Sequence, residues 1–187
     1  MTTITHLIDT LTEWARLNIC EHVLLKQPPA DLEAPVDEEY EYKLVHPAAF
    51  PLYMPTAEKL PPTIHSPFPS LCVRFMSGAD NIAGREGGAT VQLGFSAWNP
   101  GTHEVEEFTR TSEGWRDVWN FVDVALRAVE STTAIGGYTI DPKTPVEFGP
   151  WAEQEAIPDF YPYWFAWVTF RVTYPLLRNV AGVQEFL

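Results

Sequence analysis

The sequence predicts an α+β fold in which two helices cover one face of a largely antiparallel β-sheet, with a long proline-rich excursion inserted. Two stretches repeat their apolar residues at intervals of three and four, as amphipathic helices do. Several other runs alternate apolar and polar residues with a period of two, as half-buried strands do. Helices and strands are segregated more than strictly alternated along the 187 residues, and this order favours an α+β layer.

The size and charge of the chain limit the classes of protein to which it can belong. At 187 residues and 45% hydrophobic, the chain can bury one sizeable core, so we expect a single domain over residues 1–187. A formal charge of -13 argues against nucleic-acid binding, which needs clustered lysine and arginine. The sequence shows neither a basic leader with a long apolar run nor a membrane span. We therefore expect a soluble protein made in a cytoplasm, with no membrane partner.

The first predicted element is an amphipathic helix from Thr3 to about Ile19, with Thr2 or Thr3 as its N-cap. Its apolar residues recur at helical spacing: Ile4, Leu7, Ile8, Leu11, Trp14, Ala15 and Ile19. Cys20 follows this helix and Cys72 lies in a predicted strand, and neither belongs to a C-x-x-C motif. We expect both to be free, partly buried thiols.

Residues 26–69 form the proline-rich, acidic excursion, which holds ten of the 17 prolines. Proline at this density interrupts helices and strand ladders, so at most a short strand is expected, near Tyr40 to Val45. The run from Asp31 to Glu41 is either an exposed, solvated loop or a docking surface for a basic partner. Its acidic residues are Asp31, Glu33, Asp37, Glu38, Glu39 and Glu41.

Two strands are predicted next, at about residues 70–76 and 91–97, joined as a hairpin by a glycine-rich turn region. Gly84, Gly87 and Gly88 are interpreted as turn residues, because no G-K-[ST] follows them and no helix opens there. Residues 99–102 (N-P-G-T) predict a further turn and then a short link to the second helix.

The second helix is predicted from about Glu113 to Glu130, with Thr111 or Ser112 as its N-cap. Its wide apolar stripe includes Trp115, Val118, Trp119 and Val122, which we expect to lie on the sheet. After Ile135-Gly136-Gly137, short strands are predicted at residues 138–140 and 145–148.

The chain is organised around a last, long strand that Pro162 and Pro175 bracket. One face of this strand is wholly apolar, and we expect Val168 and Phe170 on it to lie under the second helix. The opposite face begins with aromatic residues and then becomes polar, which is more apolar surface than water normally faces. The candidate subunit interface is therefore the aromatic cluster Tyr161, Tyr163, Phe165 and Trp167.

Motifs that carry chemistry are absent from the sequence. The five histidines are scattered without H-E-x-x-H or another metal-ligand spacing, and they are His6, His22, His46, His65 and His103. A serine nucleophile elbow, a Walker loop and paired catalytic carboxylates are missing as well. We therefore expect no catalytic residue, no cofactor and no metal, and we expect the protein not to be an enzyme.

Four segments together carry a resemblance to a known family. They are F-P-S-L-C-V-R at 68–74, G-A-D-N at 78–81, the helical S-E-G-W-R-D-V-W-N-F-V-D-V-A-L-R at 112–127, and F-Y-P-Y-W-F-A-W-V-T-F at 160–170. In this combination the chain resembles the tail terminator, or tail completion, proteins of siphoviruses, the long-tailed phages. The resemblance spans the chain from about residue 60 onward, and the P-Y-W-F segment is its most specific part.

The resemblance implies a structural virion protein at the head-proximal end of the tail, assembled in the host cytoplasm. Such a subunit forms a ring, expected to be a hexamer, that caps the tail tube, stops its polymerisation and docks to the head-tail connector proteins. DNA would pass through the ring without specific binding, which the acidic charge suits.

Another head-tail joining or tail protein is one alternative to a tail terminator. Two further classes of protein also stay open. A non-viral binding or adaptor module would gather Trp115, Trp119, Tyr163 and Trp167 around an enclosed space. An enzyme would bring two or more histidines and acids into one cleft.

Overall fold

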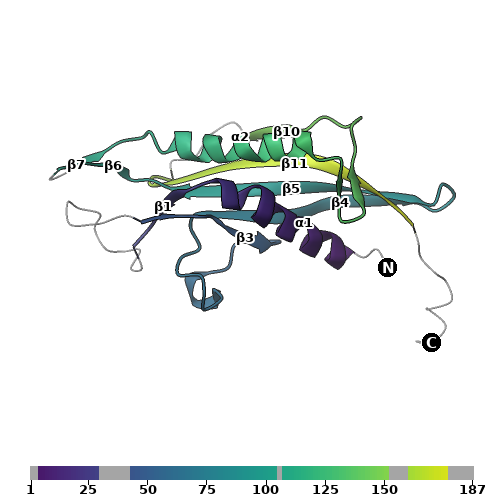
Figure 1. Cartoon of the computed structure of the whole chain (residues 1–187), viewed down its shortest axis with the longest axis horizontal. Coiled ribbons are helices and arrows are strands. Elements are labelled where there is room, and N and C mark those ends of the chain that lie inside the picture. Colours follow the sequence, from purple (N-terminus) through teal and green to yellow (C-terminus); the bar gives the residue numbers. More distant parts are fainter. Residues whose placement is uncertain (1–3, 30–42, 105–106, 152–159, 177–187) are drawn as a thin grey trace.

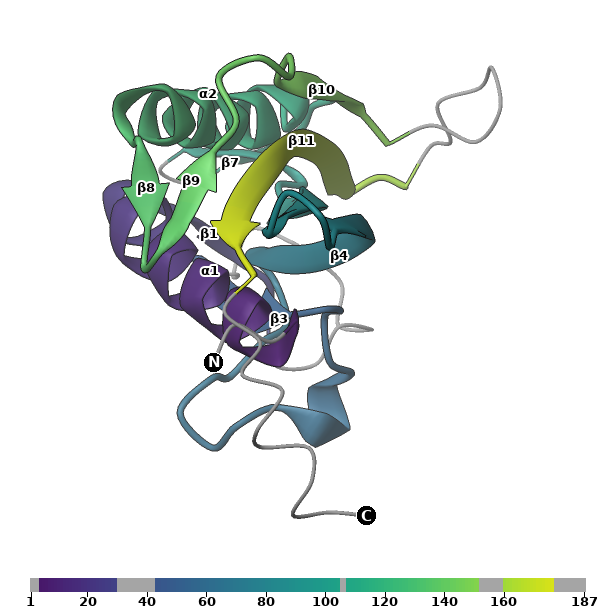
Figure 2. The same cartoon turned by 90° about the vertical axis from the view of Figure 1, so that its right-hand side faces the viewer.

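The computed structural model describes residues 4–29, 43–104, 107–151 and 160–176. A seven-stranded sheet with the order β3-β4-β5-β11-β9-β8 forms the centre, and β10 also pairs with β11. Every pairing in this sheet is antiparallel except that between β3 and β4. The two α-helices lie on the same side of the curved sheet (Figure 1, Figure 2). The predicted α+β class is thereby confirmed.

Helix α1 (Ile4–Asn18) forms where the first apolar repeat predicts a helix. It buries Leu7, Ile8, Leu11, Trp14 and Ala15 toward the sheet, and the 3-10 helix η1 (Cys20–His22) follows it. The predicted N-caps Thr2 and Thr3 lie outside the described residues.

The proline-rich excursion holds more regular structure than predicted. Strand β1 (Leu25–Gln27) pairs with β2 (Lys43–Val45) in a separate antiparallel ribbon. Strand β3 (Ala48–Pro51) joins the main sheet in parallel with β4, and a 3-10 helix, η2 (Ala57–Lys59), follows. The expectation of at most one short strand was therefore wrong. Proline is tolerated here because β3 is an edge strand and Pro51 is its last residue.

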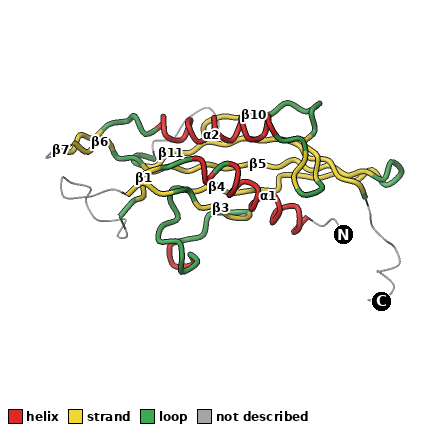
Figure 3. Tube along the Cα trace, viewed as in Figure 1, coloured by secondary structure: helices red, strands yellow, loops and turns green. Residues whose placement is uncertain are grey.

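Strands β4 (Ser70–Asn81) and β5 (Glu86–Trp98) form the predicted hairpin, but each is longer than predicted. The hairpin extends past both helices at one end of the molecule (Figure 3). Gly87 and Gly88, interpreted as turn residues, lie inside β5. A Cβ at Gly87 would overlap the ring of Tyr174, and one at Gly88 would crowd the guanidinium of Arg171. These glycines admit large side chains of the neighbouring strand.

The link to the second helix also differs from the prediction. Strands β6 (Gly101–Glu104) and β7 (Glu107–Arg110) pair as a small antiparallel sheet where only a turn and a short link were predicted. Their short, largely polar sequences give no apolar alternation to detect.

Helix α2 (Trp115–Ser131) confirms the second predicted helix, but its N-cap is Gly114 rather than Thr111 or Ser112. A Cβ at Gly114 would overlap the Trp164 indole, so the close approach of Trp164 on β11 requires a glycine at this position. Strands β8 (Ala134–Ile135) and β9 (Tyr138–Ile140) then form a hairpin through Gly136 and Gly137, both with positive φ. Strand β10 (Glu147–Pro150) lies two residues later than predicted.

Strand β11 (Tyr163–Pro175) is the central strand that its sequence pattern predicts. It pairs with β5 along its whole length, and with β10 and then β9 on its other side. Ala166, Val168, Phe170 and Val172 are buried in one core with the apolar faces of both helices, including Val118 and Val122. The predicted alternation of β11 is therefore correct, and its apolar face lies toward the helices.

Candidate interaction site on the outer sheet face

The face of the sheet that points away from the helices, here called the outer face, carries the candidate site. Because side chains alternate along strands, this face receives every second residue of β4, β5 and β11. Its members on these strands include Cys72, Arg74, Gln92, Gly94, Phe165, Trp167, Thr169 and Arg171. They are half-buried, whereas the residues between them are almost all fully buried.

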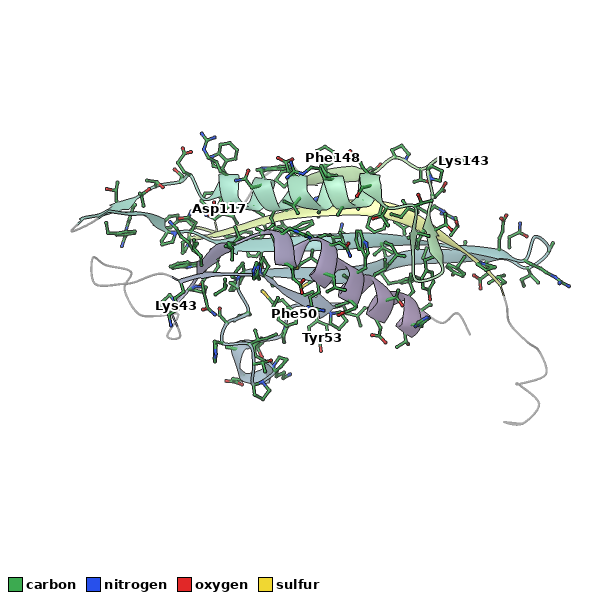
Figure 4. The ribbon with its side chains drawn as sticks, viewed as in Figure 1. Lys43, Phe50, Tyr53, Asp117, Lys143 and Phe148 are labelled. Atoms are coloured by element: carbon green, nitrogen blue, oxygen red, sulfur yellow. The ribbon has the colours of Figure 1, made fainter. Side chains whose placement is uncertain are left out.

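A groove of about 460 Å³ opens on this face and is here called the outer groove. Cys72, Gly94 and Phe165 contribute to it from the three central strands. Leu52, Tyr53 and Met54 line it from the segment after β3, and Trp151 and Phe160 line it near β10 and β11. Figure 4 shows Tyr53 near Phe50 of β3, at the opposite edge of the sheet from Phe148 and α2. Ser70, Arg74, Phe95, Ser96 and Ala166 complete the lining.

Gly94 forms the open part of the groove floor. It lies between Cys72 on β4 and Trp167 on β11 in the ladder register. A Cβ built on Gly94 would meet no atom within 4 Å. The absence of a side chain at this one position therefore keeps the floor of the groove empty.

The walls of the groove are apolar and exposed. Tyr53 is 69% exposed, Leu52 48%, Phe160 43% and Trp151 40%. Leu52 also adopts φ 65°, in the left-handed region where a leucine is strained, while its N–H donates to the Val73 carbonyl at 2.8 Å. Backbone strain of this kind concentrates at functional sites. The wall is thus an apolar surface that the backbone holds in place at a cost.

The four aromatic residues predicted as an interface have different places. Phe165 lines the groove and packs against Phe160, with ring centroids 5.5 Å apart. Tyr163 packs against Phe68 at 4.6 Å, and burial raises the pKa of its phenol.

The other two aromatic residues are tethered through their polar atoms. The Trp167 indole N–H donates to the Pro150 carbonyl at 3.1 Å, and the Tyr161 hydroxyl donates to the Pro100 carbonyl at 2.5 Å. The structure therefore places one of the four in the groove and three around it, each partly covered by the chain itself.

The end of the groove toward the β4–β5 turn is polar. Arg74 Nη1 donates to Gln92 Oε1 at 3.2 Å, and Gln92 Nε2 donates to Thr169 Oγ1 at 3.4 Å. Arg74 is the only charged side chain among the described residues that line the groove. The outer groove is therefore apolar with one cation at its edge.

Both cysteines are free, as predicted. Burial raises the pKa of Cys72 to about 11 and that of the more deeply buried Cys20 to about 12. Both thiols are therefore protonated near neutral pH, so neither has the thiolate character of a nucleophile.

Among the described residues, no three His, Cys, Asp or Glu side chains are grouped to hold a metal ion. No histidine, aspartate or glutamate lines the outer groove in that part of the chain. His46 Nδ1 donates to the Val23 carbonyl at 2.8 Å. No helix among the described residues is long and apolar enough to cross a membrane.

The aromatic residues that a ligand-binding module would gather around an enclosed space do not converge. Trp119 packs on Phe148 beside α2, with centroids 6.4 Å apart. The expectation that Trp115 lies on the sheet was wrong, because Trp115 is 41% exposed beneath the Arg116 guanidinium. Tyr163 and Trp167 belong to the outer face, across the sheet from both. The acidic cluster Asp31, Glu33, Asp37, Glu38, Glu39 and Glu41 lies outside the described residues.

Several residues of the groove were not predicted from the sequence, above all Gly94, Cys72, Arg74 and Tyr53. The alternation of residues 91–97 places Gly94 opposite the core-facing Leu93 and Phe95, and this was the available signal. Searches against protein-family models and against curated proteins find no match to the chain.

Proposed function

We propose that this chain is a structural phage protein of the tail-terminator type, whose subunits assemble head to tail into a ring. The ring caps the tail tube, stops its polymerisation and docks to the head-tail connector proteins. The observation that carries the proposal is the open, apolar outer groove with its exposed rim of Tyr53, Leu52, Trp151 and Phe160. Apolar surface of this kind marks an interaction site on a folded subunit.

The chemistry of the rim favours a protein partner. Aromatic residues in and around pockets are the usual anchors of protein interfaces, and five aromatic side chains line this groove. The described lining residues include no pair of acid and base that would favour catalysis over binding.

The charge of the chain favours a ring around DNA. Six copies carry 6 × -13 = -78 formal charges, and a channel lined by part of this charge repels the phosphate backbone. DNA can then pass without being held. A closed ring uses heterologous contacts, in which one surface of a copy meets a different surface of the next.

Multi-angle light scattering on the purified chain, with and without tail tubes, tests the proposal. A hexamer has a mass of 6 × 21.1 kDa, about 127 kDa. We expect this mass for the chain by itself or after it is mixed with tubes, and we expect the tubes to stop growing. A chain that stays at 21.1 kDa in both conditions and does not bind tubes would overturn the proposal.

A second function, the binding of a small apolar ligand by a monomer, is favoured by the groove volume alone. A volume of about 460 Å³ lies within the range of about 300 to 1,000 Å³ typical of ligand pockets. Saturable binding of a fluorescent apolar probe to a monomer that does not bind tail tubes would support this function instead.

A further inference from the structure

The place where the described chain leaves the sheet bears on what fills the outer groove. Strand β11 ends at Pro175, and the Leu176 N–H donates to the Arg85 carbonyl at 2.8 Å. Arg85 lies in the turn between β4 and β5, at the far end of the hairpin (Figure 1). Leu176, the last described residue, therefore lies at this end of the molecule and not beside the groove.

The distance from this exit to the groove of the same copy follows from the register. Trp167, which is opposite Gly94, precedes Pro175 by eight residues, or about 27 Å at about 3.4 Å per residue. Strand β11 runs away from its own groove toward the turn. Residues 177–187 would have to reverse direction to return along the polar part of the outer face, past Arg171.

The sequence of residues 177–187, L-R-N-V-A-G-V-Q-E-F-L, suits the groove chemically. Phe186 is apolar and large enough to fill a pocket floored by Gly94, and Leu187 beside it is also apolar. Glu185 precedes them and matches Arg74, the one cation among the described lining residues. Eleven residues span up to about 37 Å when extended, so the segment is long enough to extend beyond the copy to which it belongs.

We propose that residues 177–187 of one copy dock in the outer groove of the neighbouring copy, with Phe186 over Gly94 and Glu185 facing Arg74. This inference rests on the proposed ring, because it supplies a head-to-tail contact between different surfaces of identical subunits. Each copy donates one segment and receives another. The docked segment covers the apolar rim that is exposed on a single copy.

Disulfide capture tests the position of the segment. Cys72 lines the groove, and Cys20 is buried, so Phe186→Cys adds one thiol that can reach Cys72 only by docking. Oxidation with copper-phenanthroline should give a ladder of covalent oligomers on a non-reducing gel, in steps of 21.1 kDa. The ladder should disappear when Cys72 is also changed to alanine. Thr109→Cys, at an exposed position of β7, is the matched control and should give no Cys72-dependent ladder.

A charge exchange tests the same contact without a new thiol. Arg74→Glu and Glu185→Arg should each raise the concentration for half-assembly at least tenfold, and the double variant should recover most of this loss. Circular dichroism of each variant should match the wild-type chain. No recovery in the double variant, or a Cys72 cross-link that stays within one copy, would overturn the inference.

Deletion of residues 177–187 separates this inference from the proposed function. A truncated chain that is folded but no longer forms rings supports both. A truncated chain that still forms rings and caps tubes overturns the docking of this segment and leaves the proposed function standing. A full-length chain that neither forms rings nor binds tubes overturns the proposed function itself.

Discussion

Gly94 lies directly opposite Trp167 in the ladder between β5 and β11, and no atom lies within 4 Å of the place where a Gly94 Cβ would stand. One strand of the central sheet thus has a vacant position beside the largest side chain of the outer face. The vacancy is the floor of the outer groove, so a single residue sets the size of this floor.

Filling this vacancy should block assembly without harming the fold. We expect Gly94→Leu to keep the free energy of unfolding or to raise it by up to about 1 kcal/mol, because glycine inside a strand is unfavourable. Ring formation, measured by light scattering, should be lost. Thr90→Leu changes the same face of the same strand outside the groove and should assemble normally. Normal assembly of Gly94→Leu would place the contact elsewhere.

Placing a charge on the aromatic surface should have a similar effect. Trp167 is half-buried, and its indole donates to the Pro150 carbonyl. We expect Trp167→Glu to abolish ring formation while its circular dichroism stays near native, because an interface cannot cheaply desolvate an unpaired carboxylate. Trp167→Phe keeps the apolar surface and should assemble. If Trp167→Glu unfolds the subunit instead, the indole belongs to the monomer's own packing.

The core-facing side of β11 should control stability and not assembly. Phe170 is 1% exposed under the helices, and Phe170→Ala should lower the free energy of unfolding by ~3 to 5 kcal/mol in urea denaturation. Its neighbour Thr169 lies on the outer face, where its hydroxyl accepts from Gln92 at 3.4 Å. Thr169→Ala should cost about 1 kcal/mol or less. Equal losses for the two variants would mean that the faces of β11 are misassigned.

The two thiols, buried Cys20 and half-buried Cys72, should make the protein less stable at high pH. Burial raises the pKa of Cys20 to about 12 and that of Cys72 to about 11, so the folded chain keeps protons that the unfolded chain loses above about pH 9. The free energy of unfolding should therefore fall as the pH rises from about 9 toward 12. Urea titrations across this range should show a shallower decline for Cys20→Ala. Parallel curves for the two proteins would show that Cys20 does not contribute.

Much of the fold could be predicted because its largest elements carry periodic patterns. Strand β11 alternates buried and half-buried residues from Phe165 to Thr173, and the stripe of α2 recurs at three and four. Gly87 and Gly88 misled the interpretation because glycine marks turns, while here it makes room for Tyr174 and Arg171. Both side chains lie on a strand more than eighty residues away, so the local sequence gives no sign of why these positions are glycine.

The candidate site was predicted only in part for the same physical reason. Phe165 belongs to an aromatic run that is conspicuous in the sequence, so a surface role could be proposed for it. Gly94 matters only because the register sets it between Cys72 and Trp167, and Tyr53 only because the segment after β3 folds beside them. A groove made by residues from separate strands and segments is visible once the strand order is known.

The pairing of β5 with β11 also has a consequence for the order of folding. Its partners range from Trp98 with Tyr163 to Glu86 with Pro175, so they are separated by at least 65 residues of chain. The β4–β5 hairpin, whose partners are close in sequence, can form first and act as the template for β11. During synthesis at about 5 to 20 residues per second, the β5 edge waits about 3 to 13 seconds for its partner. In that interval Val91, Leu93 and Phe95 are open to other nascent chains, and a chaperone that covers them would raise the yield of folded subunits.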